Sequence, residues 1–300
     1  MEKEFNMEVK VGLIVVAYKN PSMTIRFVKE EVPKIKLNFF LVIINVAATE
    51  QESRELAEKC NLFYEEKNSL LQCSHQGVVI SSPSNLGYAK GNNLAVKYLK
   101  EKNIRCDYYL FSNDDVEFLS PNLIPVLIEK AKVDKNIAGI GPRVKCIDGM
   151  EGSPERMYYS PMAIILNTIR CKKRKKDRNF DSVDIREGRV YWVSGAFMLV
   201  KAFWFDLVGG FDNRTFLYYE EPILAEKFKK HGAYFYYTPN VSILHYEGGS
   251  TVGKVRNAQK RWIVEQSRIL YYKDYIHVNN FYLFMYKIYC KIKFNFKKHV

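Results

Sequence analysis

The sequence lacks the features typical of disulfide-rich, zinc-binding or membrane-spanning proteins. Its six cysteines lie far apart and include no CxxC pair, which argues against a zinc ribbon or a disulfide scaffold and favours reduced thiols. No uninterrupted apolar run approaches the roughly 18 residues that a membrane-spanning helix needs. The first ten residues contain three glutamates and no apolar segment, so we expect no secretory signal and a chain that starts in the cytosol.

Two common phosphate-binding motifs are also missing. No GxGxxG follows the first apolar run, which counts against a dinucleotide-dependent dehydrogenase, and no GxxxxGK[ST] loop is present. The net charge of +13 predicts attraction to a polyanion, a phosphorylated ligand or an anionic membrane, without choosing among them. Because the sequence has no zinc-finger spacing and no RNP-like segment, no nucleic-acid partner is expected.

The order of apolar and amphipathic segments predicts an α/β fold. Near-continuous apolar runs are typical of buried parallel strands, and amphipathic stretches between them predict helices. The expected strands cover residues 11–17, 39–44, 77–80, 108–112 and 190–200, and the expected helices cover 22–32, 50–59, 90–100 and 120–132. The last of these helices has Ser120 as its N-cap and Pro121 at its first position. The pattern predicts a Rossmann-like, mostly parallel central sheet flanked by helices on both faces.

Polar residues follow several of the expected strands, at the sheet edge where open α/β sheets bind ligands. The segments concerned are 18–21, 45–49 and 113–117. In the last one, Asp114 and Asp115 follow a buried strand directly, and two adjacent carboxylates need a positive partner there. Mg²⁺ or Mn²⁺ would suit them, because hard cations are often held by one or two carboxylates and substrate phosphates. A solvated turn in which an Asp caps the next helix is the alternative.

Six motifs in order carry a family resemblance: VVAYKN (15–20), NLGYAKGNN (85–93), SNDDVEF (112–118), WVSGAFMLV (192–200), GGFDNRTFLYYEE (209–221) and HYEGGST (245–251). Together they resemble the GT-A glycosyltransferases of family 2, and most of all the bacterial rhamnosyltransferase-like branch of surface-polysaccharide enzymes. The resemblance implies a GT-A domain over residues 1–255, with a nucleotide-binding half at about 9–118 and an acceptor-side half at about 119–255. Residues 256–300 would form a helical, basic and aromatic C-terminal extension.

The resemblance also implies a donor site and a metal site. The residues implied for donor binding are Ala17, Tyr18, Asn20, Asn45, Gly87, Lys90, Asn113 and Asp114. Asn45 stands where the family usually has Asp, so an amide replaces a charge that reads the base or ribose. Asp115 and His245 are implied as ligands of Mg²⁺ or Mn²⁺.

The pair Glu220 and Glu221 falls where the family has Glu-Asp, and Glu221 is the implied catalytic base of an inverting displacement. It departs from the family pattern because Asp has become Glu, and Ile223 stands where a second acidic residue is expected. The residues implied to line the acceptor and sugar are Trp192, Ser194, Gly195, Asp212 and Tyr219. A core position for Trp192 on a buried strand is the alternative.

The function implied is transfer of rhamnose or another hexose from a dTDP- or UDP-linked donor to a saccharide, expected to be lipid-linked, in capsule or O-antigen synthesis. The basic run KKRKKDR (172–178) and the aromatic, Lys-rich tail (281–300) favour an anionic membrane surface at the cytoplasmic face of the plasma membrane. The run could instead be a solvated loop, and the tail could pack on the protein or pair subunits into a homo-oligomer. Asn45, Glu221 and Ile223 motivate a second hypothesis, a catalytically silent relative that binds nucleotide sugar or glycan.

Overall fold

The structure is a computed structural model that describes residues 9–65, 76–147, 154, 186–246 and 256–294. The basic run at 172–178 and the last residues of the tail lie outside the described residues. The strands are β1 Lys10–Tyr18, β2 Asn38–Val46, β3 Phe63–Tyr64, β4 Gly77–Ser82, β5 Tyr108–Ser112, β6 Val116–Phe118, β7 Ile137–Cys146, β8 Gly188–Val190, β9 Phe197–Lys201 and β10 Tyr234–His245. The helices are α1 Pro21–Arg26 with its continuations η1 Phe27–Glu31 and η2 Val32–Lys34, α2 Glu50–Cys60, α3 Gly87–Glu101, α4 Leu123–Lys132, α6 Ala202–Leu207, α7 Glu220–Lys229, α8 Arg256–Asp274 and α9 Asn280–Phe294.

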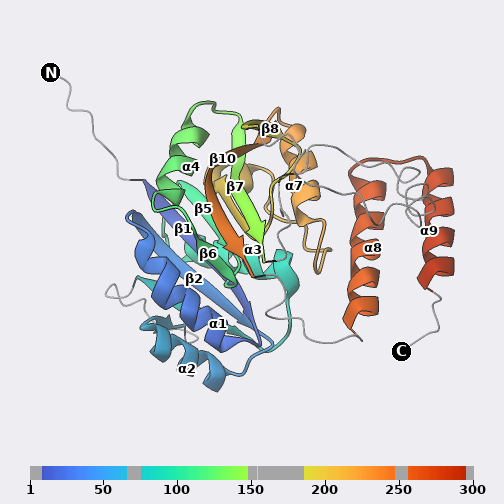
Figure 1. Ribbon diagram of the computed structural model, residues 1–300. Coiled ribbons are helices and arrows are strands. Elements are labelled where there is room, and N and C mark those ends of the chain that lie inside the picture. The colour runs from blue at the N-terminus through green and yellow to red at the C-terminus, as the bar shows by residue number, and fades with distance from the viewer. Residues whose placement is uncertain (1–8, 66–75, 148–153, 155–185, 247–255, 295–300) are drawn as a thin grey trace.

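The described strands form one ten-stranded sheet in the order β3-β4-β2-β1-β5-β9-β7-β10-β6, with β8 paired to β10 (Figure 1). The first five strands of this order pair in parallel, whereas β9 is antiparallel to both β5 and β7. The four apolar runs expected as parallel strands in the first half are β1, β2, β4 and β5. The predicted α/β fold with a mostly parallel central sheet is therefore confirmed.

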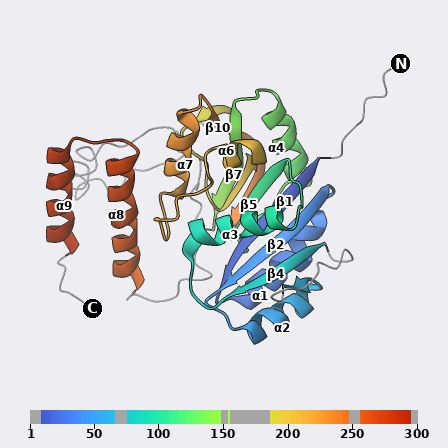
Figure 2. The ribbon, with the colours of Figure 1, turned by 180° about the vertical axis from the view of Figure 1, so that it is seen from behind.

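Helices cover both faces of the sheet, which is why the central strands are apolar on both sides. In β1, Leu13 and Val15 face a core formed with α1, η1, α2 and α4, whereas Ile14 faces the opposite core, formed with α3, α6 and α7. Figures 1 and 2 show these two helical layers from opposite sides. The ends of β1, β2 and β5 therefore meet at one polar edge between the layers.

Three predicted boundaries are wrong. Helix α4 begins at Leu123 with Asn122 at its N-cap, because the Ser120 hydroxyl instead accepts a 3.0 Å hydrogen bond from the backbone N–H of Ser242. Helix α3 begins at Gly87, three residues before its expected start. The helical stretch expected at 22–32 ends at Glu31, and Pro33 stands in the first turn of a separate 3₁₀ helix, where a missing N–H costs nothing.

The third wrong boundary is the expected strand at 190–200, which is two strands with a connection between them. β8 pairs with β10, whereas β9 pairs with β5 and β7. Because the two strands have different neighbours, residues 191–196 must cross from one part of the sheet to another. Trp192, Ser194 and Gly195 lie on this crossing segment instead of on a buried strand.

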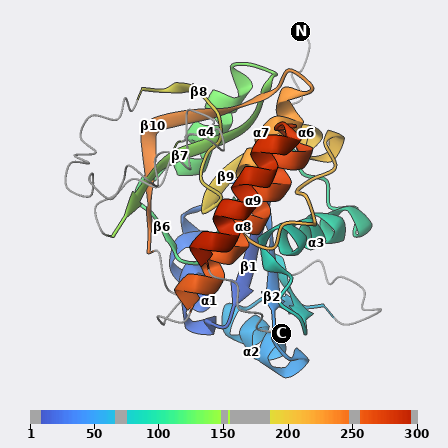
Figure 3. The same ribbon diagram turned by 90° about the vertical axis from the view of Figure 1, so that its right-hand side faces the viewer.

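The C-terminal helices α8 and α9 pack against each other beside the sheet, and α7 lies between them and the sheet (Figures 1 and 3). We call α8 and α9 together the C-terminal hairpin. Its buried contacts come from Tyr271 and Tyr272 of α8, Leu283 and Tyr286 of α9, and Ile223 of α7. Among the described residues, no helix has the length and apolar character to span a membrane.

Candidate active site

The ends of β1 and β2 bring the first predicted donor residues side by side. The parallel register pairs Ala17 with Asn45. The Asn45 amide donates a 3.0 Å hydrogen bond to the hydroxyl of Ser53 in α2, which fixes the end of β2 to that helix. Asn20 is the N-cap of α1, where its side-chain oxygen accepts from the backbone N–H of Met23 at 3.3 Å. Both amides therefore hold helices at this edge, next to the ends of the strands.

The segment after β5 lies against the end of β10. The antiparallel register pairs His245 with Val116, directly after Asp115. His245 Nε2 is 3.1 Å from Asp115 Oδ1 and 3.2 Å from Asn113 Nδ2. The backbone N–H of Tyr246 also donates to the carbonyl of Asp115 at 2.8 Å. Three predicted site residues thus come together around one imidazole nitrogen.

Asp114 and Asp115 have different surroundings although they are adjacent. Asp114 Oδ2 accepts a 2.6 Å hydrogen bond from the hydroxyl of Thr24 in α1. Burial raises the pKa of Asp114 to about 6, against the lowering effect of that hydrogen bond. Asp115 Oδ1 is buried and accepts no hydrogen bond from the described residues.

This donor set can hold a divalent cation. A buried carboxylate oxygen without a hydrogen bond, beside an imidazole nitrogen, is the combination of ligand atoms that Mn²⁺ and related cations accept. In the described part of the chain, no three His, Cys, Asp or Glu side chains gather as a complete metal site. Asp115 and His245 would therefore supply two ligands, and substrate phosphates would have to supply others.

The second acidic pair stands at the N-terminus of α7. Glu221 Oε1 accepts a 2.9 Å hydrogen bond from the backbone N–H of Gly195, and the Tyr88 hydroxyl donates to the Gly195 carbonyl at 2.8 Å. A Cβ atom at position 195 would lie 2.3 Å from Glu221 Oε1. Glycine is therefore required there for the carboxylate to approach the backbone.

Burial and mutual repulsion keep a proton on this pair. Glu220 is only 2% exposed and its Oε1 has no hydrogen-bond partner among the described residues. Its burial and the neighbouring Glu221 carboxylate raise the pKa of Glu220 to about 8. Burial also raises the pKa of Glu221, although the Gly195 N–H opposes the shift. The Gly195 N–H favours the charged form of Glu221, whereas Glu220 Oε1 has no such donor in the described part of the chain, so we assign the proton at neutral pH to Glu220 and the charge to Glu221.

The turn before α7 has an unusual backbone. Tyr218 and Tyr219 have φ values of +72° and +71°, two consecutive non-glycine residues in the left-handed region. Such a conformation costs on the order of 1–3 kcal/mol for each residue and persists only where surrounding contacts hold it. One such contact comes from α3, because the backbone N–H of Tyr88 donates to the Phe216 carbonyl at 2.9 Å.

Gly87 starts α3 with φ +70°, and a Cβ there would lie 2.0 Å from the Phe216 carbonyl oxygen. The backbone at Gly87 thus lies close to the segment before Glu220. The next predicted donor residue, Lys90, is exposed on α3.

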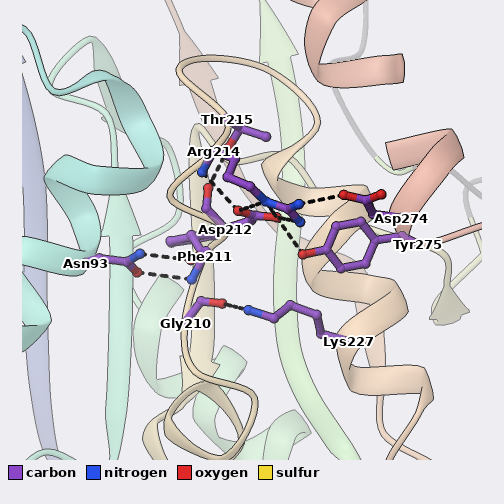
Figure 4. A network of polar contacts seen from close by, with 9 residues as sticks. All are labelled: Asn93, Gly210, Phe211, Asp212, Arg214, Thr215, Lys227, Asp274 and Tyr275. Atoms are coloured by element: carbon purple, nitrogen blue, oxygen red, sulfur yellow. Dashed lines mark hydrogen bonds and ion pairs between the residues drawn. The ribbon is translucent and has the colours of Figure 1, made fainter. Parts of the chain in front are cut away.

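Two predicted acceptor residues contact the C-terminal hairpin instead. Both oxygens of Asp212 accept from the guanidinium of Arg214, at 2.7 to 3.1 Å, and Asp212 Oδ2 accepts from the Tyr275 hydroxyl at 2.6 Å (Figure 4). Against the effect of burial, these hydrogen bonds lower the pKa of Asp212 to about 2. The Tyr219 hydroxyl accepts a short hydrogen bond from Arg268 Nε in α8.

One dipeptide connects the two acidic clusters. The backbone N–H of Asn113 donates to the Ala196 carbonyl at 2.9 Å, while the adjacent Gly195 N–H binds Glu221. On the same crossing segment, the Ser194 hydroxyl accepts from the Ala196 N–H, and Trp192 packs partly buried on the α3 side of the sheet. The site thus has Asp115 and His245 on one side of Gly195–Ala196 and the glutamate pair on the other.

Three residues around the site were not predicted from the sequence. Tyr88 lies within the NLGYAKGNN motif, which is the one sequence signal that could have drawn attention to its hydroxyl as a hydrogen-bond donor. Thr24 and Arg268 carry no local signal, because each meets its carboxylate or phenol partner only through the tertiary fold.

Curated relatives are similar to the chain over more than half of its length. No protein-family model matches it. It is 27% identical over 184 residues to the N-acetylglucosaminyl-diphospho-decaprenol L-rhamnosyltransferase of Mycobacterium tuberculosis, covering 58% of this chain and 60% of that protein. It is 29% identical over 195 residues to rhamnosyltransferase WbbL of Escherichia coli K12, covering 60% of this chain and 70% of that protein. The chain thus matches somewhat under two thirds of the mycobacterial relative's length.

Solved structures share the fold. The mannosyltransferase PcManGT of Pyrobaculum calidifontis, in complex with GDP-Man and Mn²⁺, has a TM-score of 0.55 at 14% identity, covering 92% of this chain and 66% of that one. GalNAc-T7 with UDP, GalNAc and Mn²⁺ has a TM-score of 0.57 at 14% identity, covering 89% of this chain and 50% of that one. The resemblance expected from the sequence is confirmed: the chain has the GT-A fold of glycosyltransferases and resembles rhamnosyltransferases in sequence.

Proposed function

We propose that the chain is an inverting glycosyltransferase of bacterial surface-polysaccharide synthesis, moving rhamnose or another hexose from a nucleotide diphosphate to a saccharide. One observation carries the proposal: the Asp115–His245 cluster and the glutamate pair are both anchored to Gly195–Ala196. The names of the two curated relatives support rhamnose as the sugar.

On the donor side, we propose that Asp115 and His245 hold Mg²⁺ or Mn²⁺. The structural neighbours PcManGT and GalNAc-T7 contain Mn²⁺ together with GDP-Man or UDP. When bound, the cation would offset the negative charge of the departing diphosphate. The edge formed by Ala17, Tyr18 and Asn45 would lie against the nucleoside, for which dTDP and UDP are the first candidates.

On the acceptor side, Glu221 is the proposed base. The acceptor hydroxyl would attack the anomeric carbon, its proton would pass to Glu221, and the nucleoside diphosphate would leave from the opposite face. Glu220 holds a proton beside it and so keeps a second negative charge away from the attacking oxygen. The Gly195 N–H aims the Glu221 carboxylate, and the Tyr88 hydroxyl holds Gly195 in turn.

The decisive experiment measures sugar transfer and donor binding on the same protein. We expect release of nucleoside diphosphate from one donor among dTDP-, UDP- and GDP-sugars, with a saccharide acceptor and Mn²⁺ or Mg²⁺. The same nucleotide should raise the melting temperature, and a chelator should remove both effects. Stabilisation without any turnover would instead support a silent relative that binds nucleotide sugar. The absence of both stabilisation and turnover would refute the donor site.

We also propose that the outward face of α9 contacts an anionic membrane surface at the cytoplasmic face of the plasma membrane, which would bring the site to a lipid-linked acceptor. Phe281, Phe284 and Met285 recur at helical spacing and are 64%, 60% and 45% exposed. Lys287 and Lys291 are exposed on the same helix. Aromatic side chains flanked by lysines suit a layer of anionic headgroups. The name of the mycobacterial relative includes a diphospho-decaprenol substrate, which supports a lipid-linked acceptor here.

Sedimentation with vesicles tests this surface. Binding to vesicles with anionic lipid, but not to neutral ones, should fall strongly in a Phe281→Ser, Phe284→Ser double variant. Phe203 is 67% exposed on α6, so Phe203→Ser is the matched control and should bind as the wild type does. If the double variant binds normally but changes from dimer to monomer, the face pairs subunits and the membrane proposal is wrong.

A further inference from the structure

We infer that the C-terminal hairpin is part of the catalytic apparatus, and that Arg268 is a positioning residue for the base Glu221. The inference rests on the proposed function, since it takes Glu221 to be the base. It assigns a role to α8 that neither membrane contact nor subunit pairing requires. The observations that carry it are the contacts between the hairpin, α7 and the turn before α7.

One face of α7 and its N-cap is fastened to the hairpin at three points. Tyr219, Ile223 and Glu226 are four and three residues apart, so their side chains share one face. The Tyr219 hydroxyl accepts from Arg268, and Ile223, fully buried, packs in the core of the hairpin. Glu226 Oε1 accepts from the Tyr191 hydroxyl at 2.7 Å, and that hydroxyl makes a short hydrogen bond with Tyr271 of α8.

The structure explains why Ile223 replaces the acidic residue that the family pattern leads one to expect. A carboxylate at this position would be buried among Tyr271, Tyr272 and Leu283. An apolar side chain is needed because an unpaired charge in that cluster would be costly. The departure from the family pattern therefore coincides with the contact between α7 and the hairpin.

Arg268 is held in place by hydrogen bonds to both α8 and α9. Its Nη1 is 2.9 Å from both carboxylate oxygens of Glu265 and donates to the Tyr286 hydroxyl of α9 at 2.7 Å. Tyr286 donates in turn to Glu265 Oε2 at 2.5 Å. Glu265 is 5% exposed, and both of its carboxylate oxygens accept from Arg268 while Tyr286 bonds to both partners, which helps to offset the cost of burying the pair. The remaining Nε of Arg268 is thereby directed to Tyr219.

Tyr219 passes this restraint to the base. Arg268 lies over the Tyr219 ring, 5.4 Å from its centroid, in addition to the hydrogen bond to its hydroxyl. The Tyr219 carbonyl accepts the first bond of α7, from Ile223 N–H at 3.1 Å. Because Tyr218 and Tyr219 both have positive φ, the turn needs external contacts to keep it, and Glu221 is two residues further on.

The hairpin also holds the earlier part of the same segment. Arg214 joins Asp212 to Asp274 at the end of α8, and Tyr275 donates to Asp212 (Figure 4). The Ser267 hydroxyl donates to the Leu217 carbonyl at 3.1 Å. The segment 212–219 thus contacts α8 near both of its ends, through Arg214 and Tyr219. A loss of the hairpin contacts would release the segment that leads into the glutamate pair.

The experiment compares Arg268→Gln, Arg268→Lys, Tyr219→Phe and the Arg268→Gln, Tyr219→Phe double variant. Tyr219→Phe removes one hydroxyl and keeps the ring, and Arg268→Lys keeps a cation beside Glu265 without the fork that reaches Tyr219. We expect kcat to fall about 10- to 100-fold in each single variant, because small misplacement of a base costs rate. Donor binding should stay within about twofold, and the double variant should lose no more than Arg268→Gln alone. Arg261→Gln, an exposed change on the same helix, is the matched control.

Several results would overturn the inference. Unchanged kcat in Tyr219→Phe and Arg268→Lys would do so, as would losses that multiply in the double variant or that fall on donor binding. If Arg268→Gln fails to fold, the other two single variants decide the question. Hydrogen exchange of the amides at 221–224 gives a readout without turnover, and should quicken in all the hairpin variants. If the wild type shows no transfer, the proposed function fails, while this exchange still decides whether Arg268 orders the turn.

Discussion

The two acidic pairs of the site are built alike but serve different partners. In each pair burial raises the pKa of the first carboxyl, to about 6 for Asp114, which accepts the hydroxyl of Thr24, and to about 8 for Glu220. The other member lies toward the centre of the site. Asp115 lies against the imidazole of His245, whereas Glu221 lies against the backbone N–H of Gly195.

The difference shows how one motif of adjacent carboxylates can be used in two ways. Beside an imidazole and just after the end of β5, Asp115 is suited to share a cation. Beside a backbone N–H and a protonated neighbour, Glu221 is suited to receive a proton. From this comparison we expect the first member of each pair to matter for stability and the second member for chemistry.

The largest expected effect comes from replacing each glutamate of the pair by glutamine in turn. Glu221→Gln should lower kcat about 10³-fold, because the acceptor hydroxyl loses its base. Glu220→Gln should cost less than about 10-fold, because the amide replaces a carboxyl that is already protonated. Turnover of both variants with a fixed donor and acceptor measures this. Donor binding by thermal shift is the control, and equal losses of kcat would contradict our assignment of the base.

In the aspartate pair, we expect only Asp115 to have a large effect on metal affinity. Asp115→Asn should raise the Mn²⁺ concentration that gives half-maximal activity by about 10- to 100-fold, since a ligand is weakened. Asp114→Asn should leave that concentration within about threefold, because Asp114 is directed toward Thr24. Metal titrations of activity and of nucleotide-induced stabilisation give the two values. A larger shift in Asp114→Asn than in Asp115→Asn would reverse the roles.

The part of the site that the sequence predicts well depends on strands. The apolar runs at β1, β2 and β5 identify parallel strands, and parallel strands place their following residues at one edge. Asn45 is next to Ala17 in the parallel register, and Asn113 and Asp115 come directly after β5. The order of apolar runs is therefore enough to predict that these residues lie at one edge of the sheet.

The part that the sequence does not predict depends on contacts between distant segments. Asp212 and Tyr219 sit in a motif that suggests the acceptor, yet their partners Tyr275 and Arg268 lie far along the chain in helices with no motif of their own. Ser120 has the composition of a helix cap, but a strand amide from Ser242 competes for its hydroxyl. Local rules fail at these positions because tertiary hydrogen bonds replace local ones.

A comparable effect is expected where the base meets the crossing segment. Gly195→Ala would place a methyl group 2.3 Å from the present position of Glu221 Oε1. The carboxylate would have to move by about 1 Å, which we expect to lower kcat about 10²-fold. The control is Gly209→Ala, whose Cβ meets nothing within 4 Å; its φ of +72° strains an alanine there, so this variant should lose stability and keep its kcat. Kinetics that leave kcat unchanged in Gly195→Ala would show that this contact does not aim the base.

The smallest effect concerns stability and its dependence on pH. The pKa of Glu220 is raised from 4.5 to about 8 in the folded state, so between these pH values the folded chain keeps a proton that the unfolded chain has released. The contribution of Glu220 to the unfolding free energy should therefore be highest below about pH 4.5 and fall as the pH rises toward 8. Glu220→Gln carries no such proton, so it should exceed the wild type by about 1–3 kcal/mol at alkaline pH relative to acidic pH. Urea unfolding across this pH range measures the difference, with Glu129→Gln, an exposed change, as the control. Parallel pH profiles of the wild type and Glu220→Gln would place the proton of the pair on Glu221.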